Sequence, residues 1–207
     1  MTDETNEPVK KLDPATIRRW RNDIVFSDTL RGIPLSFHST WGLFSPEKVD
    51  EGSRLLLDNL DINPTDDCLD VGCGVGVLGM VMAKLAPQGK TLLVDKDFVA
   101  VEYSQKNLAL NKITNAEAKL SNGFNHIGKQ KFDLIVSNLP AKVSNEQHYL
   151  YLIDAFEHLK PGGRFVVVTI SGLRKFIERT FKEVFGNYEK LKQGGTYTVA
   201  QAVKRGG

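Results

Sequence analysis

Residues 67–76 read Asp-Cys-Leu-Asp-Val-Gly-Cys-Gly-Val-Gly, and this stretch decides the fold. A short apolar segment reaches Asp70 and then breaks into a loop that contains Gly72, Gly74 and Gly76, after which an apolar helical run begins. Glycines allow the backbone to turn tightly and to approach a ligand without a Cβ in the way. The pattern predicts a buried strand, a ligand-binding loop and a helix.

Two acidic residues distinguish the ligands that such a loop could bind. Residues 74–79 also satisfy the Gly-x-Gly-x-x-Gly pattern of dinucleotide loops. Both interpretations expect an acid at the end of the next strand, and Asp95 supplies it for either. Asp70, just ahead of the glycines, suits a cationic ligand group, whereas in a dinucleotide loop it would add negative charge beside the phosphates. The pattern favours S-adenosylmethionine over NAD, and over a glycine turn that serves only packing.

Length and composition set the outer bounds. A chain of 207 residues suits one domain with a modest extension, and its formal charge of +2 argues neither for nor against nucleic acid. No apolar run is long enough to span a bilayer, and the polar N-terminus lacks a signal-peptide core, so we expect no membrane association. Cys68 and Cys73 are read as small buried residues of a reduced, cytoplasmic protein. The four histidines are scattered, so we expect no metal site.

The chain divides into three predicted segments. Residues 1–12 are expected to form a flexible tail, residues 13–60 an N-terminal helical extension with the loop leading into the core, and residues 61–207 the ligand-binding core. Asp13-Pro14 and Ser45-Pro46-Glu47 each predict the start of a helix in the extension.

Strands and helices alternate after residue 66, which predicts a parallel sheet with helices on both faces. Strands are expected near residues 67–71, 90–95, 116–121, 132–137 and 164–170. Helices are expected near residues 76–86, 97–111, 145–159 and 172–184. A Gly194-Gly195 turn between two further strand-like runs predicts an antiparallel C-terminal hairpin. The expected fold class is α/β, a Rossmann-like methyltransferase fold with a seven-stranded, mostly parallel sheet.

From about residue 37 to residue 204 the chain resembles the compact, single-domain members of the RsmC-like class I methyltransferases. Those enzymes methylate the exocyclic 2-amino group of guanine in ribosomal RNA. The resemblance rests on the following segments: Phe37-His-Ser-Thr-Trp-Gly-Leu-Phe-Ser45, Asp70-Val-Gly-Cys-Gly-Val-Gly-Val-Leu78, Asp95, Ser121-Asn122-Gly123-Phe124 and Phe132-Asp-Leu-Ile-Val-Ser-Asn138. It implies S-adenosylmethionine as cofactor, S-adenosylhomocysteine as product, ribosomal RNA as partner, and a monomer or weak dimer.

The expected donor site follows from these segments. Its residues are Asp70, Gly72, Gly74, Gly76, Asp95, Lys96, Asn122 and Asn138. Asp95 is expected to bind the two ribose hydroxyls, and Asp70 the methionine amino group, although it could instead cap the amides of the glycine loop. Asn122 is expected at the adenine edge, or it serves only as a turn residue. Asp97 is expected to cap the helix that follows.

The expected catalytic residues are Asn138, Leu139 and Pro140, followed by Ala141, where amino-group methyltransferases usually have Asn-Pro-Pro-aromatic. The side-chain oxygen of Asn138 could accept a hydrogen bond from the acceptor amine, unless this residue only caps the turn. Leu139 precedes proline and is therefore biased to an extended conformation. The missing aromatic residue leaves stacking on a base to residues from other loops. The candidates are Phe37, Trp41, Phe44 and Tyr149.

Three other functions stay open at this stage. The acceptor could be a small molecule or a protein amide, or the chain could be a non-catalytic module that binds the cofactor or RNA. An NAD(P)-linked oxidoreductase would need a catalytic pair such as Tyr-x-x-x-Lys, and none stands out. Two sets of basic residues could contact RNA or could simply be solvated. They are Arg18, Arg19 and Arg21 around Trp20, and Arg174, Lys175, Arg179 and Lys182.

Overall fold

The computed structural model describes residues 13–206, so the predicted tail, residues 1–12, lies outside the described residues. The elements, in chain order, are α1 (Pro14–Arg21), β1 (Ile24–Leu30), β2 (Ile33–Ser39), α2 (Glu51–Asp58), β3 (Cys68–Val71), α3 (Val77–Leu85), β4 (Thr91–Asp95), α4 (Phe98–Leu110), β5 (Ala116–Leu120), β6 (Phe132–Asn138), α5 (Asn145–His158), β7 (Leu159–Ile170), the 3-10 turn η1 (Ser171–Leu173), α6 (Arg174–Phe185), β8 (Glu189–Gln193) and β9 (Tyr197–Val203).

The main sheet has seven strands in the order β5-β4-β3-β6-β7-β9-β8. The first five in this order pair in parallel, whereas β9 is antiparallel to both β7 and β8. This confirms the predicted parallel core and its antiparallel C-terminal hairpin. The chain runs outward from β3 to β5 and then returns to the other side of β3, so the strand order reverses between β3 and β6. Open α/β sheets bind their ligands at the carboxyl ends of the strands beside such a reversal.

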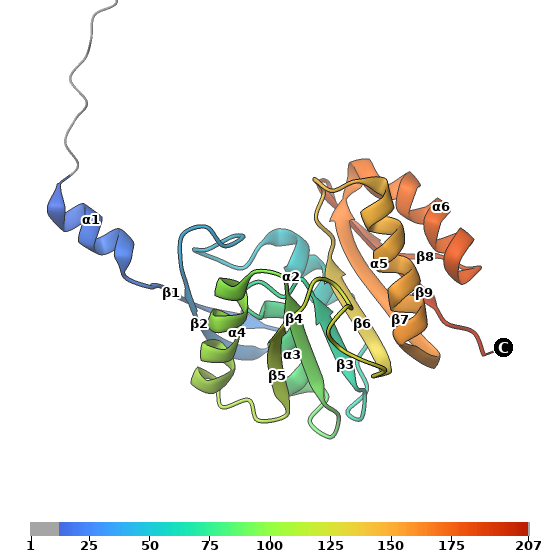
Figure 1. Cartoon of the computed structure of the whole chain (residues 1–207), viewed down its shortest axis with the longest axis horizontal. Helices are drawn as coiled ribbons and strands as arrows, with labels where there is room; N and C mark the ends of the chain where they lie inside the picture. The colour runs from blue at the N-terminus through green and yellow to red at the C-terminus, as the bar shows by residue number, and fades with distance from the viewer. Residues whose placement is uncertain (1–12, 207) are drawn as a thin grey trace, which may run out of the picture.

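Helices cover both faces of the sheet, as predicted (Figure 1). Successive side chains of a strand point to opposite faces, and the sequence uses this period of two. Cys68 and Leu134 belong to an apolar cluster with α2, α3 and α4 on one face. Leu69 and Ile135 belong to a second cluster with α5 and α6 on the other face. The central strands are therefore buried on both sides, as is usual for parallel sheets.

The N-terminal segment differs from the helical extension that the sequence predicts. Between α1 and the core it contains an antiparallel hairpin, β1–β2, whose tight turn places Arg31 at φ 52° and Gly32 at φ 78°. Asn107 of α4 holds this hairpin, because its side-chain oxygen accepts from the backbone amide of His38 at 2.7 Å and its nitrogen donates to the His38 carbonyl at 2.9 Å. Asn111, the C-cap of α4, bonds the backbone amide and carbonyl of Ser36 in the same two-way manner.

The second predicted helix start is wrong. The helix begins not at Ser45-Pro46-Glu47 but at Glu51, and Asp50 is its N-cap, whose side chain accepts from the Ser53 amide at 2.9 Å. Residues 40–50 instead form an irregular segment beside the carboxyl ends of the strands. The Asp13 cap of α1 is as predicted: its carboxylate accepts from the Thr16 amide at 3.2 Å.

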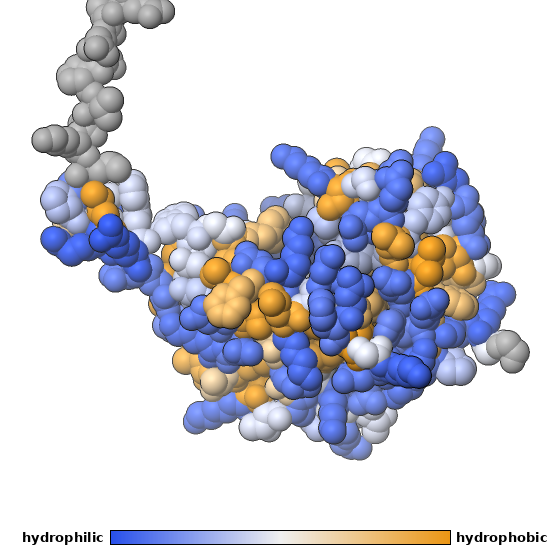
Figure 2. Space-filling model, viewed as in Figure 1, coloured by the Kyte–Doolittle hydropathy of each residue, from blue (hydrophilic) through white to orange (hydrophobic). Residues whose placement is uncertain are grey.

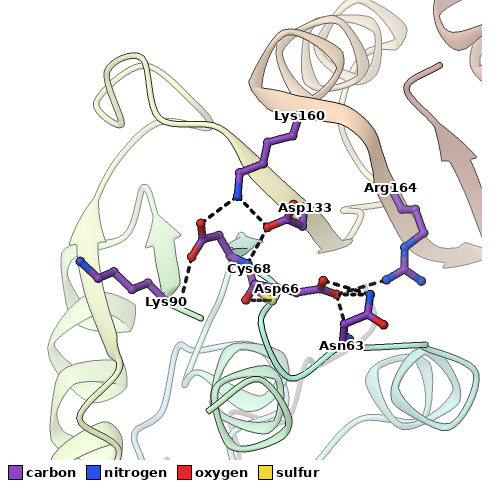
Figure 3. A network of polar contacts seen from close by, with 8 residues as sticks. Asn63, Asp66, Cys68, Lys90, Asp133, Lys160 and Arg164 are labelled. Atoms are coloured by element: carbon purple, nitrogen blue, oxygen red, sulfur yellow. Dashed lines mark hydrogen bonds and ion pairs between the residues drawn. The ribbon is translucent and has the colours of Figure 1, made fainter. Parts of the chain in front are cut away.

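At the amino ends of the strands, ion pairs join the parallel core (Figure 3). Lys160 of β7 donates to Asp67 at 2.9 Å and to Asp133 of β6 at 2.7 Å. The same Asp133 carboxylate accepts from the backbone amide of Asp67 at 2.9 Å, and Asp67 accepts from the amide of Lys90 at 3.0 Å. These bonds tie together β3, β4, β6 and β7 at the edge of the sheet opposite the cavity described below.

Candidate active site

A cavity of about 490 Å³ opens at the carboxyl ends of β3, β4 and β6. Five segments line it. They are residues 43–53, the glycine loop 70–78, residues 95–100, residues 121–123, and residues 137–147. Tyr151, Ile170 and Tyr197 complete the wall. The cavity lies at the strand-order reversal, where this class of fold binds ligands.

The glycine loop is held rigidly between β4 and α4. Gly72, Gly74 and Gly76 have φ angles of 77°, 56° and 91°, in the left-handed region that residues with a Cβ rarely adopt. The backbone amides of Gly72 and Cys73 donate to the Val94 carbonyl at 2.8 and 3.0 Å. The three predicted loop glycines are therefore needed for the turn itself. Gly72 and Gly74 also line the cavity, whereas Gly76 packs against Leu93 and Ser104.

The third glycine of the Gly-x-Gly-x-x-Gly pattern has a packing role. A Cβ on Gly79 would lie between 2.3 and 2.8 Å from three side-chain carbons of Leu93, so α3 approaches β4 more closely than alanine allows. Loops of this kind use glycine for close helix–strand packing whichever nucleotide they bind. Gly79 therefore does not discriminate between the two ligands that the sequence pattern left open.

Asp95 closes the loop from the end of β4. Its Oδ2 accepts from the Gly74 amide at 2.9 Å and its Oδ1 accepts from the Asp97 amide at 3.0 Å. Each carboxylate oxygen has further acceptor capacity, which suits a pair of vicinal hydroxyls. Asp97 caps α4 as predicted, because its side chain accepts from the Val99 amide at 2.9 Å. Lys96 lies between them and also lines the cavity.

Asp70 is fully buried and lines the inner end of the cavity. Its Oδ2 accepts from the Gly79 amide at 2.8 Å, and its Oδ1 has no hydrogen-bond partner among the described residues. Burial raises the pKa of the Asp70 carboxyl to about 7; the bond from Gly79 opposes this and the nearby Asp95 charge adds to it. One oxygen thus accepts from the first turn of α3, and not from the amides of the glycine loop as the alternative interpretation expected, and the other is free to accept from a ligand.

The side chain of Asn138 is oriented by two residues that the sequence did not single out. Its Nδ2 donates to Oδ1 of Asp50 at 3.0 Å and to Oγ of Ser53 at 3.2 Å. These bonds use both amide hydrogens and leave the side-chain oxygen available at the cavity wall. Asp50 and Ser53 lie 88 and 85 residues away in sequence. The only sequence signal at Asp50 is that of a helix cap.

The loop after Asn138 is fixed to the sheet. Leu139 is buried, at 3% exposure, and its amide donates to the Val168 carbonyl at 3.0 Å, which continues the pairing of β6 with β7. Pro140 also lines the cavity, and its carbonyl lies 3.0 Å from Nε2 of His148 on α5. The three predicted catalytic residues therefore stand together on one wall.

Asn122 also lines the cavity, but another residue makes its turn. Ser121 donates from its hydroxyl to the Gly123 carbonyl at 2.7 Å and accepts from the His126 amide at 3.1 Å. The Asn122 side chain is thus not used in the turn. Tyr151 of α5 packs closely over the turn: a Cβ on Gly123 would lie 2.9 Å from the Cε1 atom of Tyr151.

The structure separates the four aromatic residues that the sequence suggested as a stacking platform. Phe37 is fully buried and stacks on Phe26, with ring centroids 4.9 Å apart, so it belongs to the core beneath the hairpin. Tyr149 points outward and bonds Glu183 of α6. Trp41 is exposed but does not line the cavity, whereas Phe44, at 68% exposure, stands at its mouth. Of the four, only Phe44 is placed to contact a ligand in the cavity.

The structure also places the cysteines and the basic residues of α6 that the sequence singled out. Cys68 and Cys73 are both free and buried, as predicted. Residues 13–206 contain no helix long and apolar enough to cross a membrane and no cluster of three potential metal-binding side chains. On α6, Lys182 pairs with Glu178 at 2.6 Å and Arg179 with Glu183 at 3.7 Å, so these cations are largely balanced on their own helix.

A doubly wound sheet of this order, with a glycine loop after its first strand and an acid at the end of its second, defines the class: a Rossmann-like methyltransferase fold. The chain belongs to the methyltransferase small domain family, whose sequence profile matches residues 34–201.

Three relatives show how far the likeness extends. Ribosomal RNA small subunit methyltransferase C of Hamiltonella defensa is 35% identical over 190 residues, which are 89% of this chain and 53% of that protein. Ribosomal RNA large subunit methyltransferase G of Shewanella loihica is 29% identical over 82% of this chain and 45% of its own. A structure of the T. thermophilus 16S rRNA N2 methyltransferase RsmC, in complex with AdoMet and guanosine, superposes with a TM-score of 0.80 at 30% identity, covering 87% of this chain and 50% of that one. The chain thus spans about half the length of these relatives.

Proposed function

We propose that this chain is an S-adenosylmethionine-dependent methyltransferase that methylates the exocyclic 2-amino group of guanine in ribosomal RNA and releases S-adenosylhomocysteine. The observation that carries the proposal is the fixed amide of Asn138, whose nitrogen is held by Asp50 and Ser53 while its oxygen remains available in the cavity. The names of the relatives support the same chemistry. An RNA substrate and two free cysteines both favour the cytoplasm.

The donor fits the half of the cavity around the glycine loop. Asp95 would accept from the two ribose hydroxyls with its remaining lone pairs, and Oδ1 of Asp70 would accept from the methionine ammonium. Asn122 would meet the adenine edge, with Tyr151 alongside. Lys96 would lie at the ribose side. A cationic amine beside Asp70 also stabilises the ionised carboxylate, which burial otherwise disfavours.

The acceptor fits the half of the cavity around Asn138. Methyl transfer is an in-line displacement, so catalysis consists mainly in holding the amine nitrogen about 3 Å from the methyl carbon, opposite the sulfur. The oxygen of Asn138 and the carbonyl of Leu139 would accept from the two amine hydrogens. The nitrogen lone pair is then directed at the methyl group, and the proton leaves after the transfer.

A replacement for the missing aromatic residue comes from two other segments. Phe44 stands at the cavity mouth, and Tyr197 of β9 also lines it. Tyr197 packs on Gly52, where a Cβ would lie 3.2 Å from two ring carbons, and Gly52 adjoins Asp50, the partner of Asn138. We place the guanine between these two side chains. Stacking of a base on an aromatic ring contributes about 1–3 kcal/mol.

The test has two stages. Calorimetric titration with S-adenosylmethionine should give binding that is lost in Asp95→Ala. Radiolabelled donor and ribosomal RNA from cells that lack this protein should then yield labelled N2-methylguanosine after digestion to nucleosides. If the protein binds the donor and labels a small molecule or a protein but no RNA, the proposed acceptor is wrong and the proposed enzyme class is right. A folded protein that binds no donor would refute the proposal.

A further inference from the structure

Helix α1 extends from the body of the fold and covers no part of the core. Figure 1 shows it projecting beyond the start of β1, away from the sheet. None of its eight residues is buried. Helices in proteins gain most of their stability from packing an apolar face, and a short helix without such packing is marginal in water. We therefore look for a function of α1 in its solvent-exposed side chains.

What α1 presents is positive charge around one aromatic ring. Arg18, Arg19 and Arg21 are all accessible to solvent, and Trp20 is 42% exposed between them. Arg18 and Arg21 are three residues apart and share one face of the helix. Within residues 13–206, none of the three arginines forms an ion pair with a carboxylate. Figure 2 shows this helix as a largely hydrophilic projection.

The chain directly after α1 is anchored, which gives the helix a defined origin. Asp23 accepts from the hydroxyl of Tyr103 at 2.7 Å, contacts Nδ1 of His38 at 2.7 Å and pairs with Lys106. Lys106 and the other partners lower the pKa of the Asp23 carboxyl well below its usual range, so the anchor stays charged at neutral pH. Only Asn22 separates this anchor from Arg21.

Accessible arginines around an aromatic ring match single-stranded RNA. Guanidinium groups bind phosphates, and an exposed indole stacks on an unpaired base of any sequence. A further cation, Lys48, lines the cavity without an ion pair to any described residue, so positive charge is present at the cavity as well. A basic helix with a tryptophan also suits an anionic membrane surface, but a cation at the cavity is better explained by a phosphate-bearing substrate.

We propose that α1 is a docking arm for the substrate RNA, with Arg18, Arg19 and Arg21 on phosphates and Trp20 on a base. The inference rests on the proposed function and adds to it. The relatives are about twice as long as this chain, and α1 precedes the family match, which begins at residue 34. The arm thus belongs to the part of this chain that the family profile does not cover.

The experiment compares two charge-reversed triple variants of the full chain. One carries Arg18→Glu, Arg19→Glu and Arg21→Glu. The matched control carries Lys175→Glu, Arg179→Glu and Lys182→Glu on α6, with the same change in net charge. Fluorescence anisotropy with a labelled RNA stem-loop containing guanines in its loop is measured from low to moderate salt, and S-adenosylmethionine affinity is measured in parallel.

We expect the α1 variant to bind RNA at least about tenfold more weakly at low salt. The slope of log affinity against log salt should fall by about one for each phosphate that the variant no longer binds. The α6 control should bind RNA as the wild type does, and both variants should keep donor affinity. Wild-type RNA affinity in the α1 variant, or an equal loss in the control, would overturn the inference. If neither the donor nor RNA binds to the wild type, the proposed function fails as well.

A second measurement detects RNA at the arm directly. Trp41→Phe leaves Trp20 as the single tryptophan of the chain. Its fluorescence should be quenched on adding the RNA stem-loop but not on adding vesicles that contain phosphatidylserine. Quenching by the vesicles alone would assign α1 to a membrane surface and overturn the RNA assignment.

Discussion

His148 supports the loop of Asn138 through Pro140, whose carbonyl oxygen lies 3.0 Å from its Nε2. A carbonyl can only accept, so Nε2 donates this bond. Nδ1 is buried and has no partner among the described residues, and the ring packs on Phe176 with centroids 5.6 Å apart. Helix α5 thus holds the loop after Asn138, which contains Pro140, by one directed hydrogen bond.

Replacing His148 tests this support. His148→Phe should preserve the packing on Phe176 but remove the bond to Pro140, and we expect turnover to fall by up to about tenfold, the value of one hydrogen bond. Donor affinity should be unchanged, because the glycine loop is not involved. The control is His158→Phe at the far end of α5, whose Nε2 instead lies 3.1 Å from the Gly128 carbonyl. Equal turnover in both variants would show that loop support does not limit the reaction.

The orientation of Asn138 predicts a graded series of activities. Asn138→Ala removes the oxygen that we assign to the acceptor amine, and turnover should fall by about 100-fold, as for loss of one preorganised hydrogen-bonding group at a transition state. Ser53→Ala removes only one of the two groups that orient the amide and should have a smaller effect. Single-turnover transfer to RNA, with donor affinity measured alongside, checks the order. Wild-type turnover in Asn138→Ala would exclude this residue from catalysis.

The raised pKa of Asp70 predicts that the free energy of unfolding decreases as pH rises. Its pKa is about 7 in the folded chain against a usual 3.8, so the folded state holds a proton that the unfolded chain releases between these values. Stability from this residue is therefore fully present below about pH 4, falls as pH rises to about 7, and is constant above. The change amounts to about 4 kcal/mol at most. Urea unfolding at pH 5 and pH 8 should show a smaller decrease in Asp70→Asn than in the wild type; parallel decreases would contradict the assignment.

The same group predicts that donor binding releases a proton. If the methionine ammonium pairs with ionised Asp70, affinity should decrease by up to about tenfold per pH unit below about pH 7. Calorimetry in two buffers of different ionisation enthalpy measures the proton directly. Near pH 6.5 the dependence of the observed enthalpy on the buffer should show release of a proton. At pH 9 the free α-amino group, with a pKa of about 8, is mostly neutral, so binding as an ammonium should take up a proton and reverse the sign of this dependence. Buffer-independent enthalpies at both pH values would place the ammonium elsewhere.

Gly79 tests the close packing of α3 on β4. Gly79→Ala puts a Cβ against the side chain of Leu93, and we expect a loss of about 1–3 kcal/mol in the free energy of unfolding. Val81→Ala in the same helix is a useful contrast, because it removes volume at a buried position instead of adding it. In the double variant Gly79→Ala with Leu93→Ala, the penalty of the first substitution should be smaller. Additive effects would mean that another neighbour causes the loss.

Local sequence patterns were enough to predict part of this structure. Alternating apolar runs and glycine turns were enough to predict the parallel core, the C-terminal hairpin and the Asp97 cap, because strand burial and helix starts depend on neighbours in the chain. The β1–β2 hairpin was missed because its stability comes from Asn107 and Asn111, about 70 residues further along. Its local signals are the two-residue turn Arg31-Gly32 and the strand-like runs on either side of it.

The sequence by itself determined the sheet, the glycine loop and the acids at the two strand ends, because each depends on the backbone geometry or the charge of residues close together in the chain. The tertiary structure alone decided which side chains complete the site. Phe37 and Phe44 are both aromatic and seven residues apart, yet packing buries one in the core and leaves the other at the cavity mouth. Asp50, which bonds Asn138 across 88 residues, was visible only as a helix cap. Long-range contacts of this kind depend on how layers pack, and no local pattern encodes them.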